Sequence, residues 1–224
     1  MGVGHIAVAL GASKGAPRLN VGWLVFAAFL ADFLLGIFAA LGLEHVSAPP
    51  DYAARHYLLF TFPYSDGLLA LLVWATIAGF LISRAHDFDR ERLFLLVAVV
   101  VLSHFVLDGL VHVAGLPLVG ENSPKLGLGL WNHLRLELTL ETVMAIAGMA
   151  IYWKLSGASR SGLSRYGMAI FVMLVTAMTW TQLSATTPPS TQSMTVSLLI
   201  VPLAFSAIAY GLDRKRARAA APAC

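Results

Sequence analysis

Long apolar segments alternate with short polar connectors along most of the chain, and this pattern predicts an all-α integral membrane protein. A helix that crosses a bilayer needs about 20 mainly apolar residues. Six segments approach or reach that length, and each is bounded by charged residues or by clusters of Gly, Pro, Ser and Thr. These segments are residues 21–43, 67–82, 93–112, 134–153, 168–183 and 195–212. Ser65 and Asp66 precede the second segment and are predicted to cap that helix.

Residues 1–12 are apolar but too short to span a bilayer, and no basic segment precedes them. They therefore fit neither a signal peptide nor a full transmembrane helix. No internal repeat divides the chain, so residues 1–224 are predicted to form a single membrane domain. Within it, residues 1–155 carry the polar groups of interest, and residues 156–224 add two transmembrane helices and a basic tail.

Composition supports this class and excludes an ordinary soluble domain. The chain is 58% hydrophobic and 12% charged, with a mean hydropathy of +0.76, which leaves too little polar surface to dissolve a core of this size. The single cysteine, Cys224, is the last residue. It forms no intrachain disulfide and gives no indication of the redox compartment.

The placement of lysine and arginine predicts the topology. With six spans, one side of the membrane receives Lys14, Arg18, Arg84, Arg90, Arg92, Lys154, Arg160, Arg165 and the tail Arg214-Lys215-Arg216-Ala217-Arg218. The other side receives only Arg55, Lys125 and Arg135. The positive-inside rule then places both termini in the cytoplasm, which suits a bacterial inner membrane protein. The basic tail is expected to bind anionic membrane lipids rather than nucleic acid.

The third apolar segment carries an unusual set of ionisable residues. His104, Asp108 and His112 recur at every fourth position, so on a helix they share one face with a drift of roughly 40° per step. Ionisable groups inside a membrane cost a few kcal/mol each and usually face a partner or a cavity. Asp32 lies at a depth similar to that of His104. Further acidic groups, Glu44, Asp66, Glu137 and Glu141, fall in the outer half of the predicted bundle, and one pocket that opens outward would hold them all.

Histidine nitrogen and carboxylate oxygen are ligands of zinc, manganese and iron, and zinc is favoured here. His104 and His112 are about 12 Å apart along a helix axis at 1.5 Å per residue, so a single ion does not easily take both. Either Asp108 bridges two ions, or His112 supports the site from outside the ligand set. Asp32, Asp66 and Glu141 would supply the remaining oxygens, with Asp66 or Glu141 as a catalytic base.

The same polar residues also have purely structural interpretations. The polar stripe would also serve as a hydrogen-bonded contact between transmembrane helices, and Asp32 would also serve as the partner of a histidine or of a backbone group. Glu137 and Glu141 would be interfacial, with Arg135 pairing one of them. Three function classes follow: a metal-dependent hydrolase acting on a lipid or another phosphoester, an ion- or proton-coupled transporter, and a non-catalytic scaffold or haem protein. The sequence shows no pair of discontinuous helices, the feature that would favour a transporter. A haem held by two histidines would need imidazoles from two spans, and only the third segment clearly carries them.

Several motifs together resemble one family. They are His5, Asp32, Gly42-Leu43-Glu44, Pro63-Tyr64-Ser65, Ser103-His104, Leu107-Asp108, His112 and Gly127-Leu128-Gly129-Leu130-Trp131-Asn132. In this order they resemble the YdjM-like inner-membrane proteins, which are described as metal-dependent hydrolases. The resemblance covers roughly residues 1–153. It implies a metal site built from His5, Asp32, His104, Asp108 and His112.

The chain departs from the family pattern at one place. Where the family tends to read Tyr-Ser-His-Ser, this sequence reads Tyr64-Ser65-Asp66-Gly67. An aspartate still binds a hard metal ion, but the imidazole of the family pattern is lost. His5 raises a separate requirement: it reaches the pocket only if residues 1–12 enter the bundle as a half-helix.

Overall fold

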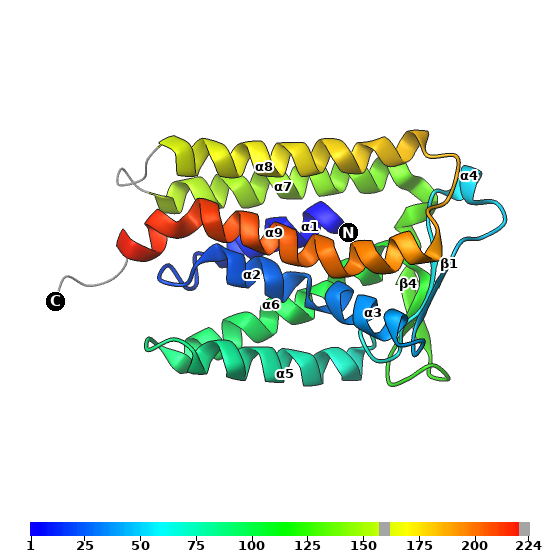
Figure 1. The fold of residues 1–224 in the computed structure, drawn as a ribbon, viewed down its shortest axis with the longest axis horizontal. Coiled ribbons are helices and arrows are strands. Elements are labelled where there is room, and N and C mark those ends of the chain that lie inside the picture. The colour runs from blue at the N-terminus through cyan, green and yellow to red at the C-terminus, as the bar shows by residue number, and fades with distance from the viewer. Residues whose placement is uncertain (157–161, 220–224) are drawn as a thin grey trace.

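The computed structural model describes the backbone of residues 1–156 and 162–219 and the side chains of residues 1–154 and 164–213. Helices make up most of this length, and they lie roughly along one common direction (Figure 1). Cys224, Arg160 and the side chains of the basic tail lie outside the described residues, so the predictions made for them stay predictions.

The first half of the chain forms α1 (Gly2–Ala12), α2 (Val21–Ala28), α3 (Leu30–Ala40), β1 (His45–Ser47), α4 (Tyr52–Arg55), β2 (Leu59–Thr61), α5 (Leu68–Arg84) and α6 (Arg90–Val111). The second half forms β3 (Val113–Pro117), β4 (Lys125–Leu128), the 3-10 helix η1 (Leu130–His133), α7 (Leu134–Ser156), α8 (Gly162–Trp180), the 3-10 helix η2 (Thr181–Ser184) and α9 (Thr191–Ala219).

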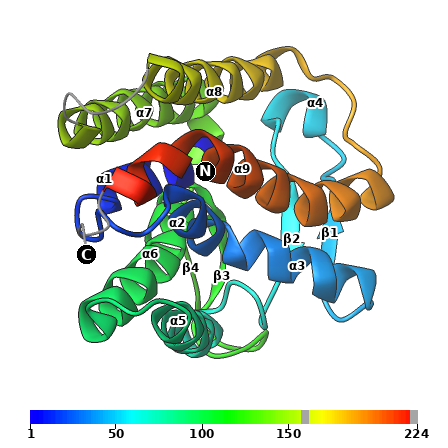
Figure 2. The same ribbon diagram turned by 60° about the vertical axis from the view of Figure 1, so that its left-hand side comes forward.

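The helices pack in antiparallel neighbours around a short central one. α5 lies against α6, α9 crosses α2 and α3, and α7 lies beside α8 (Figures 1 and 2). Helix α1 begins near the middle of the bundle and runs between α7, α2 and α6. Two antiparallel hairpins, β1–β2 and β3–β4, lie together at one end of the helices. The prediction of an all-α protein is thus confirmed for the bundle, whereas the two predicted loops contain these short strands.

Among the described residues, three helical segments are long and apolar enough to cross a membrane: Arg90–Val111, Ser164–Ser184 and Thr191–Asp213. The pair α2 and α3 passes the same test as one unit that is bent by 52° at Phe29, which makes a fourth. Large apolar side chains are exposed on these helices, among them Val99, Met178 and Ile200. Such surfaces suit contact with lipid better than contact with water.

The other two predicted spans, α5 and α7, are not among these candidates. Helix α5 has 17 residues, close to the length predicted for it, and α7 carries Arg135, Glu137 and Glu141 in its first turns, as the sequence shows. The prediction that Ser65 and Asp66 cap α5 is wrong. The N-cap is Gly67, and no side-chain hydrogen bond caps the helix. The carboxylate of Asp66 lies beside His104 instead.

Apart from His5, helix α1 is apolar on all sides, and its position explains that composition. A helix without a polar face is stable only where every side is covered. Val3, Ile6 and Leu10 are fully buried in the largest core cluster. On one side the backbone of α1 approaches α7 so closely that a Cβ at Gly148 would lie 2.5 Å from the carbonyl oxygen of Ala7. Gly148 therefore permits the depth at which α1 lies.

We expect the substitution Gly148→Ala to destabilise the protein, because the added methyl group meets backbone atoms that cannot rotate away. Overpacking of this kind typically costs about 1–3 kcal/mol. Thermal unfolding of the detergent-purified protein measures it as a lower melting temperature. The control is Gly211→Ala on α9, where a Cβ meets nothing within 4 Å. Equal stability of the two variants would contradict the proposed role of Gly148.

Candidate metal centre

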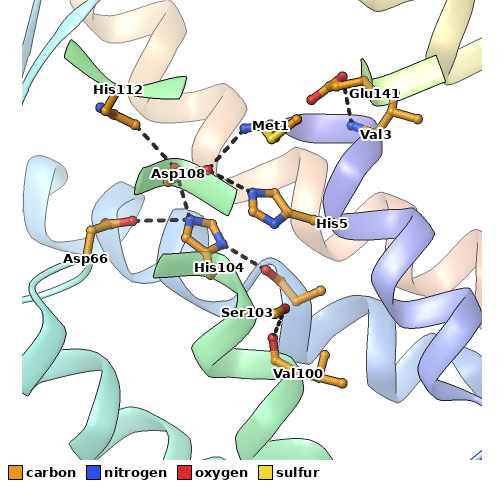
Figure 3. Close-up of polar contacts among 11 residues, drawn as sticks. Met1, Val3, His5, Asp66, Val100, Ser103, His104, Asp108, His112 and Glu141 are labelled. Atoms are coloured by element: carbon orange, nitrogen blue, oxygen red, sulfur yellow. Dashed lines mark hydrogen bonds and ion pairs between the residues drawn. The ribbon is translucent and has the colours of Figure 1, made fainter. Parts of the chain in front are cut away.

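Two helices that are distant in sequence bring three predicted ligands together. His5 comes from α1, and His104 and Asp108 come from α6 (Figure 3). One ligand atom from each lies within 4.8 Å of the others, and all three side chains are buried. The Nε2 atom of His5 is 3.3 Å from Oδ1 of Asp108. The prediction that residues 1–12 enter the bundle and bring His5 to the pocket is therefore confirmed.

Asp108 lies at the centre of the group, and both of its oxygens are in use. Oδ1 is 3.2 Å from the amino group of Met1 and 3.3 Å from His5. Oδ2 is 3.4 Å from Nε2 of His104 and 3.3 Å from Nε2 of His112. The four-residue spacing thus places an imidazole on either side of one carboxylate, as the sequence pattern predicts. His112 itself is the C-cap of α6, with an extended backbone.

His104 is oriented by a contact with the broken helix. Its Nδ1 lies 2.9 Å from the carbonyl oxygen of Ala28, which is the last residue of α2. Carbonyl groups at a helix end have no intrahelical partner, so the break at Phe29 supplies the acceptor. With Nδ1–H donating to Ala28, Nε2 presents its lone pair to the carboxylates. This is the usual arrangement of a metal-binding histidine.

Nε2 of His104 is close to two carboxylates without making an aligned hydrogen bond. It lies 3.2 Å from Oδ1 of Asp66 and 3.4 Å from Oδ2 of Asp108, yet this buried atom has no hydrogen-bond partner in the described structure. The His5 ring stacks on the His104 ring with 4.1 Å between the centroids and 2° between the planes. A buried nitrogen in these surroundings is well placed to bind a cation.

Asp66 is positioned by the hairpin end that precedes α5. The hydroxyl of Ser65 donates a hydrogen bond to Oδ2 of Asp66. Oε1 of Glu44 accepts hydrogen bonds from the backbone N–H groups of Tyr64 at 2.7 Å and Ser65 at 3.0 Å. Burial raises the pKa of Glu44 to about 7. The sequence shows Glu44 in the Gly42-Leu43-Glu44 motif. Its role as the acceptor that holds the turn before Asp66 depends on the β1–β2 pairing, which brings Tyr64 beside it.

The Gly-Leu-Gly-Leu-Trp run holds His112 in place. Gly127 has a φ of +155°, and a Cβ there would lie 2.3 Å from the carbonyl oxygen of His112. The N–H of Gly129 donates to that same oxygen at 2.8 Å. The ring of Trp131 packs on the His112 ring with 4.1 Å between centroids. The motif is thus explained by the close approach of its backbone and by one aromatic contact.

The remaining predicted residues lie at the margin. Asp32 is half-buried in the first turn of α3 and interacts electrostatically with His104 and Asp108, but it is outside the group of mutually close ligand atoms. Glu141 accepts a hydrogen bond from the N–H of Val3 at 3.3 Å and so holds the start of α1. This contact depends on how α1 packs against α7, which the pattern of residues along the chain does not show.

With its histidines neutral, the site sets the carboxylates of Asp66 and Asp108 against one cation, the Met1 amino group. In the part of the chain that the structure describes, no ion pair brings a lysine or arginine side chain to Asp66 or Asp108. Buried carboxylates normally pair with a cation or bind a metal ion. The imidazoles, the Met1 amino group and the carboxylates together therefore form a site that favours an additional positive charge.

Comparisons with protein-family models, with curated proteins and with solved structures found no match for this chain.

Glu44 gives the stability a predicted pH dependence. Its pKa is about 7 in the folded protein against an ordinary 4.5, so between these pH values the folded state binds more protons than the unfolded state. The stabilising contribution is therefore fully present below about pH 4.5 and is lost as the pH rises through 7. Glu44→Gln keeps the acceptor oxygen but cannot titrate.

We expect the melting temperature of the wild type to fall relative to that of Glu44→Gln across this pH range, measured in one detergent and at one ionic strength. Glu121→Gln changes an exposed glutamate and serves as the control. Parallel pH profiles for the wild type and Glu44→Gln would show that Glu44 is not the titrating group.

Proposed function

We propose that this protein is a membrane-embedded metal-dependent hydrolase whose substrate is a phosphoester, with lipid phosphoesters as the favoured class. The observation that carries the proposal is the buried Nε2 of His104. It has no hydrogen-bond partner in the described structure, and it faces His5, Asp108 and Asp66. The motifs that resemble the YdjM-like proteins, and their order along the chain, support the same proposal.

The residues present fit a divalent metal ion. His5, His104 and Asp108 supply the nitrogen and oxygen ligands that zinc takes, and three protein ligands leave a coordination position open, as catalytic zinc sites require. Manganese and iron suit the same donors. The second oxygen of Asp108, beside His112 at 3.3 Å, offers a place for a second ion. A bound ion would act as a Lewis acid that polarises a phosphoryl oxygen and makes water more acidic.

Asp66 is the proposed general base. Its Oδ1 lies 3.2 Å from Nε2 of His104, so it is next to the position where the histidines and Asp108 converge. The Ser65 hydroxyl is bonded to the other oxygen and keeps the carboxylate turned inward. Glu141 is a weaker candidate, because one of its oxygens already holds the backbone of α1.

The proposal includes the predicted topology: six spans, both termini in the cytoplasm and insertion in a bacterial inner membrane. This topology is supported by the three helices that are long and apolar enough to cross a membrane and by the bent α2–α3 pair. The asymmetry of lysine and arginine supports the orientation. The short α5 and the acidic α7 would then cross beside longer neighbours, with the metal centre opening toward the outer side.

The first test is elemental analysis of purified wild-type protein beside His104→Ala and Asp108→Ala, after loosely bound metal has been removed. We expect near-stoichiometric zinc, manganese or iron in the wild type, and a loss in both variants larger than the roughly 10–100-fold weakening that a supporting residue causes. His86→Ala is the matched control, because the His86 ring also contacts a backbone carbonyl, that of Ile82. A value near two ions per chain would support the bridging role of Asp108.

A metal-free wild type whose melting temperature does not rise when metal is added would contradict the hydrolase. His104, Asp108 and His112 would then form a helix-packing network or a proton path.

The second test concerns Asp66. We expect Asp66→Asn to retain metal but to lose phosphoester hydrolysis by about 10²–10⁴-fold, the usual contribution of a general base. Phosphate release from lipid phosphoesters in mixed micelles measures this rate, with Glu121→Gln as the control. Full activity of Asp66→Asn would assign the base to another residue.

A further inference from the structure

A second polar feature, a cavity, lies beside the metal centre. This cavity of about 360 Å³ is lined by the first two residues of the chain, by α4, β2 and the segment between them, by η1 and the start of α7, and by residues of η2, α9 and the segment between them. Trp131 and Phe60 belong to its wall, and both also pack against His112, at 4.1 Å and 5.4 Å between ring centroids. The cavity therefore shares one wall with the metal site.

Aromatic side chains form much of this wall. Tyr57 stacks on Trp131 with 5.8 Å between the centroids and 16° between the planes, and Phe60 lies 6.1 Å from the same indole. Tyr52 lines the cavity as well. Aromatic residues gather at membrane surfaces as a belt, but here they surround a hollow. Aromatic walls attract organic cations through the negative potential of the ring faces.

Two buried carboxylates complete the lining. Glu137 and Glu141 are four residues apart, so they lie on the same face of α7, and they are only 4% and 2% exposed. Oε2 of Glu141 accepts the N–H of Val3, whereas its Oε1 is buried and has no hydrogen-bond partner among the residues described. Two like charges on neighbouring turns of a helix repel each other unless a cation or a proton lies close to them. The Met1 amino group lines the same cavity and interacts with both glutamates, but its ion pair is with Asp108.

The composition of the lining selects the kind of cation. No described residue of the lining is lysine or arginine, and its one cation, the Met1 amino group, is paired with Asp108. The two carboxylates therefore outnumber it, which disfavours a phosphate group there. The guanidinium of nearby Arg55 is already engaged by Asp51 and by the Tyr57 hydroxyl. The volume far exceeds that of a metal ion, and aromatic rings are poor metal ligands. Alkyl groups on a nitrogen would contact the rings while the positive charge faces Glu137 and Glu141.

We propose that this cavity binds an organic ammonium group. Because the cavity shares a wall with the metal centre, the ammonium belongs to the substrate's head group; only this assignment to a substrate rests on the proposed hydrolase. Binding of the ammonium group itself needs no metal. The exposed residues Gln182 and Pro189 lie at the rim of the cavity, so the group enters from the surface.

The test uses full-length protein stripped of metal, with choline chloride as the probe and sodium chloride at the same ionic strength as the reference. We expect choline to bind in calorimetric titration and to raise the melting temperature. Glu137→Gln should weaken binding at least about tenfold, since it removes a buried charge that faces the cation. Glu137 has no hydrogen bond to the α1 backbone among those of the described residues, so this variant is expected to fold. Glu141→Gln is the second variant, and the exposed Glu121→Gln is the control.

A second arm separates the two sources of the ammonium group. The same metal-free protein is reconstituted with phosphatidylcholine or with phosphatidylglycerol, and the melting temperatures are compared. Binding of free choline supports the site, and stabilisation by phosphatidylcholine alone supports it with a lipid head group as the source. Equal behaviour in choline and sodium chloride, together with equal stability in both lipids, would overturn the inference. Unchanged choline binding by Glu137→Gln and Glu141→Gln would also overturn it. A failure of the hydrolase proposal would leave choline binding intact.

Discussion

The buried carboxylate of Asp108 is the constraint on which the rest of this structure depends. A carboxylate removed from water is costly unless positive or hydrogen-bonding groups surround it. Here both oxygens meet such groups: Met1 and His5 on one side, His104 and His112 on the other. Metal binding would satisfy the same requirement more completely, which is why the geometry supports a metal centre.

Several irregular features of the fold follow from this requirement. The apolar α1 lies inside the bundle, where Gly148 makes room for it, and this position brings His5 to Asp108. The break between α2 and α3 frees the carbonyl of Ala28, which orients His104. Each departure from a regular helical bundle thus supports one side chain of the site, and strained or irregular backbone is expected where function requires it.

The two proposed binding regions divide the chemistry between them. The metal centre combines imidazoles and carboxylates in a small buried space, whereas the neighbouring cavity combines aromatic rings with Glu137 and Glu141. Trp131 belongs to both, since it packs on His112 and lines the cavity. A substrate with a cationic head group and a phosphoester would place its charge in the cavity and its reacting group near Asp66. Occupation of one region would therefore position the ligand in the other.

The sequence by itself determined the helical class, the membrane-compatible apolar segments and the His104–Asp108–His112 stripe, because these depend on periodicity and on local composition. It also indicated that residues 1–12 must enter the bundle if His5 is to take part. Only the tertiary structure decided that Asp66 faces His104 instead of capping α5, that Glu44 holds the preceding turn, and that Glu141 binds the backbone of α1. Those outcomes depend on contacts between segments far apart in the chain, and packing selects among partners that a linear pattern leaves equivalent.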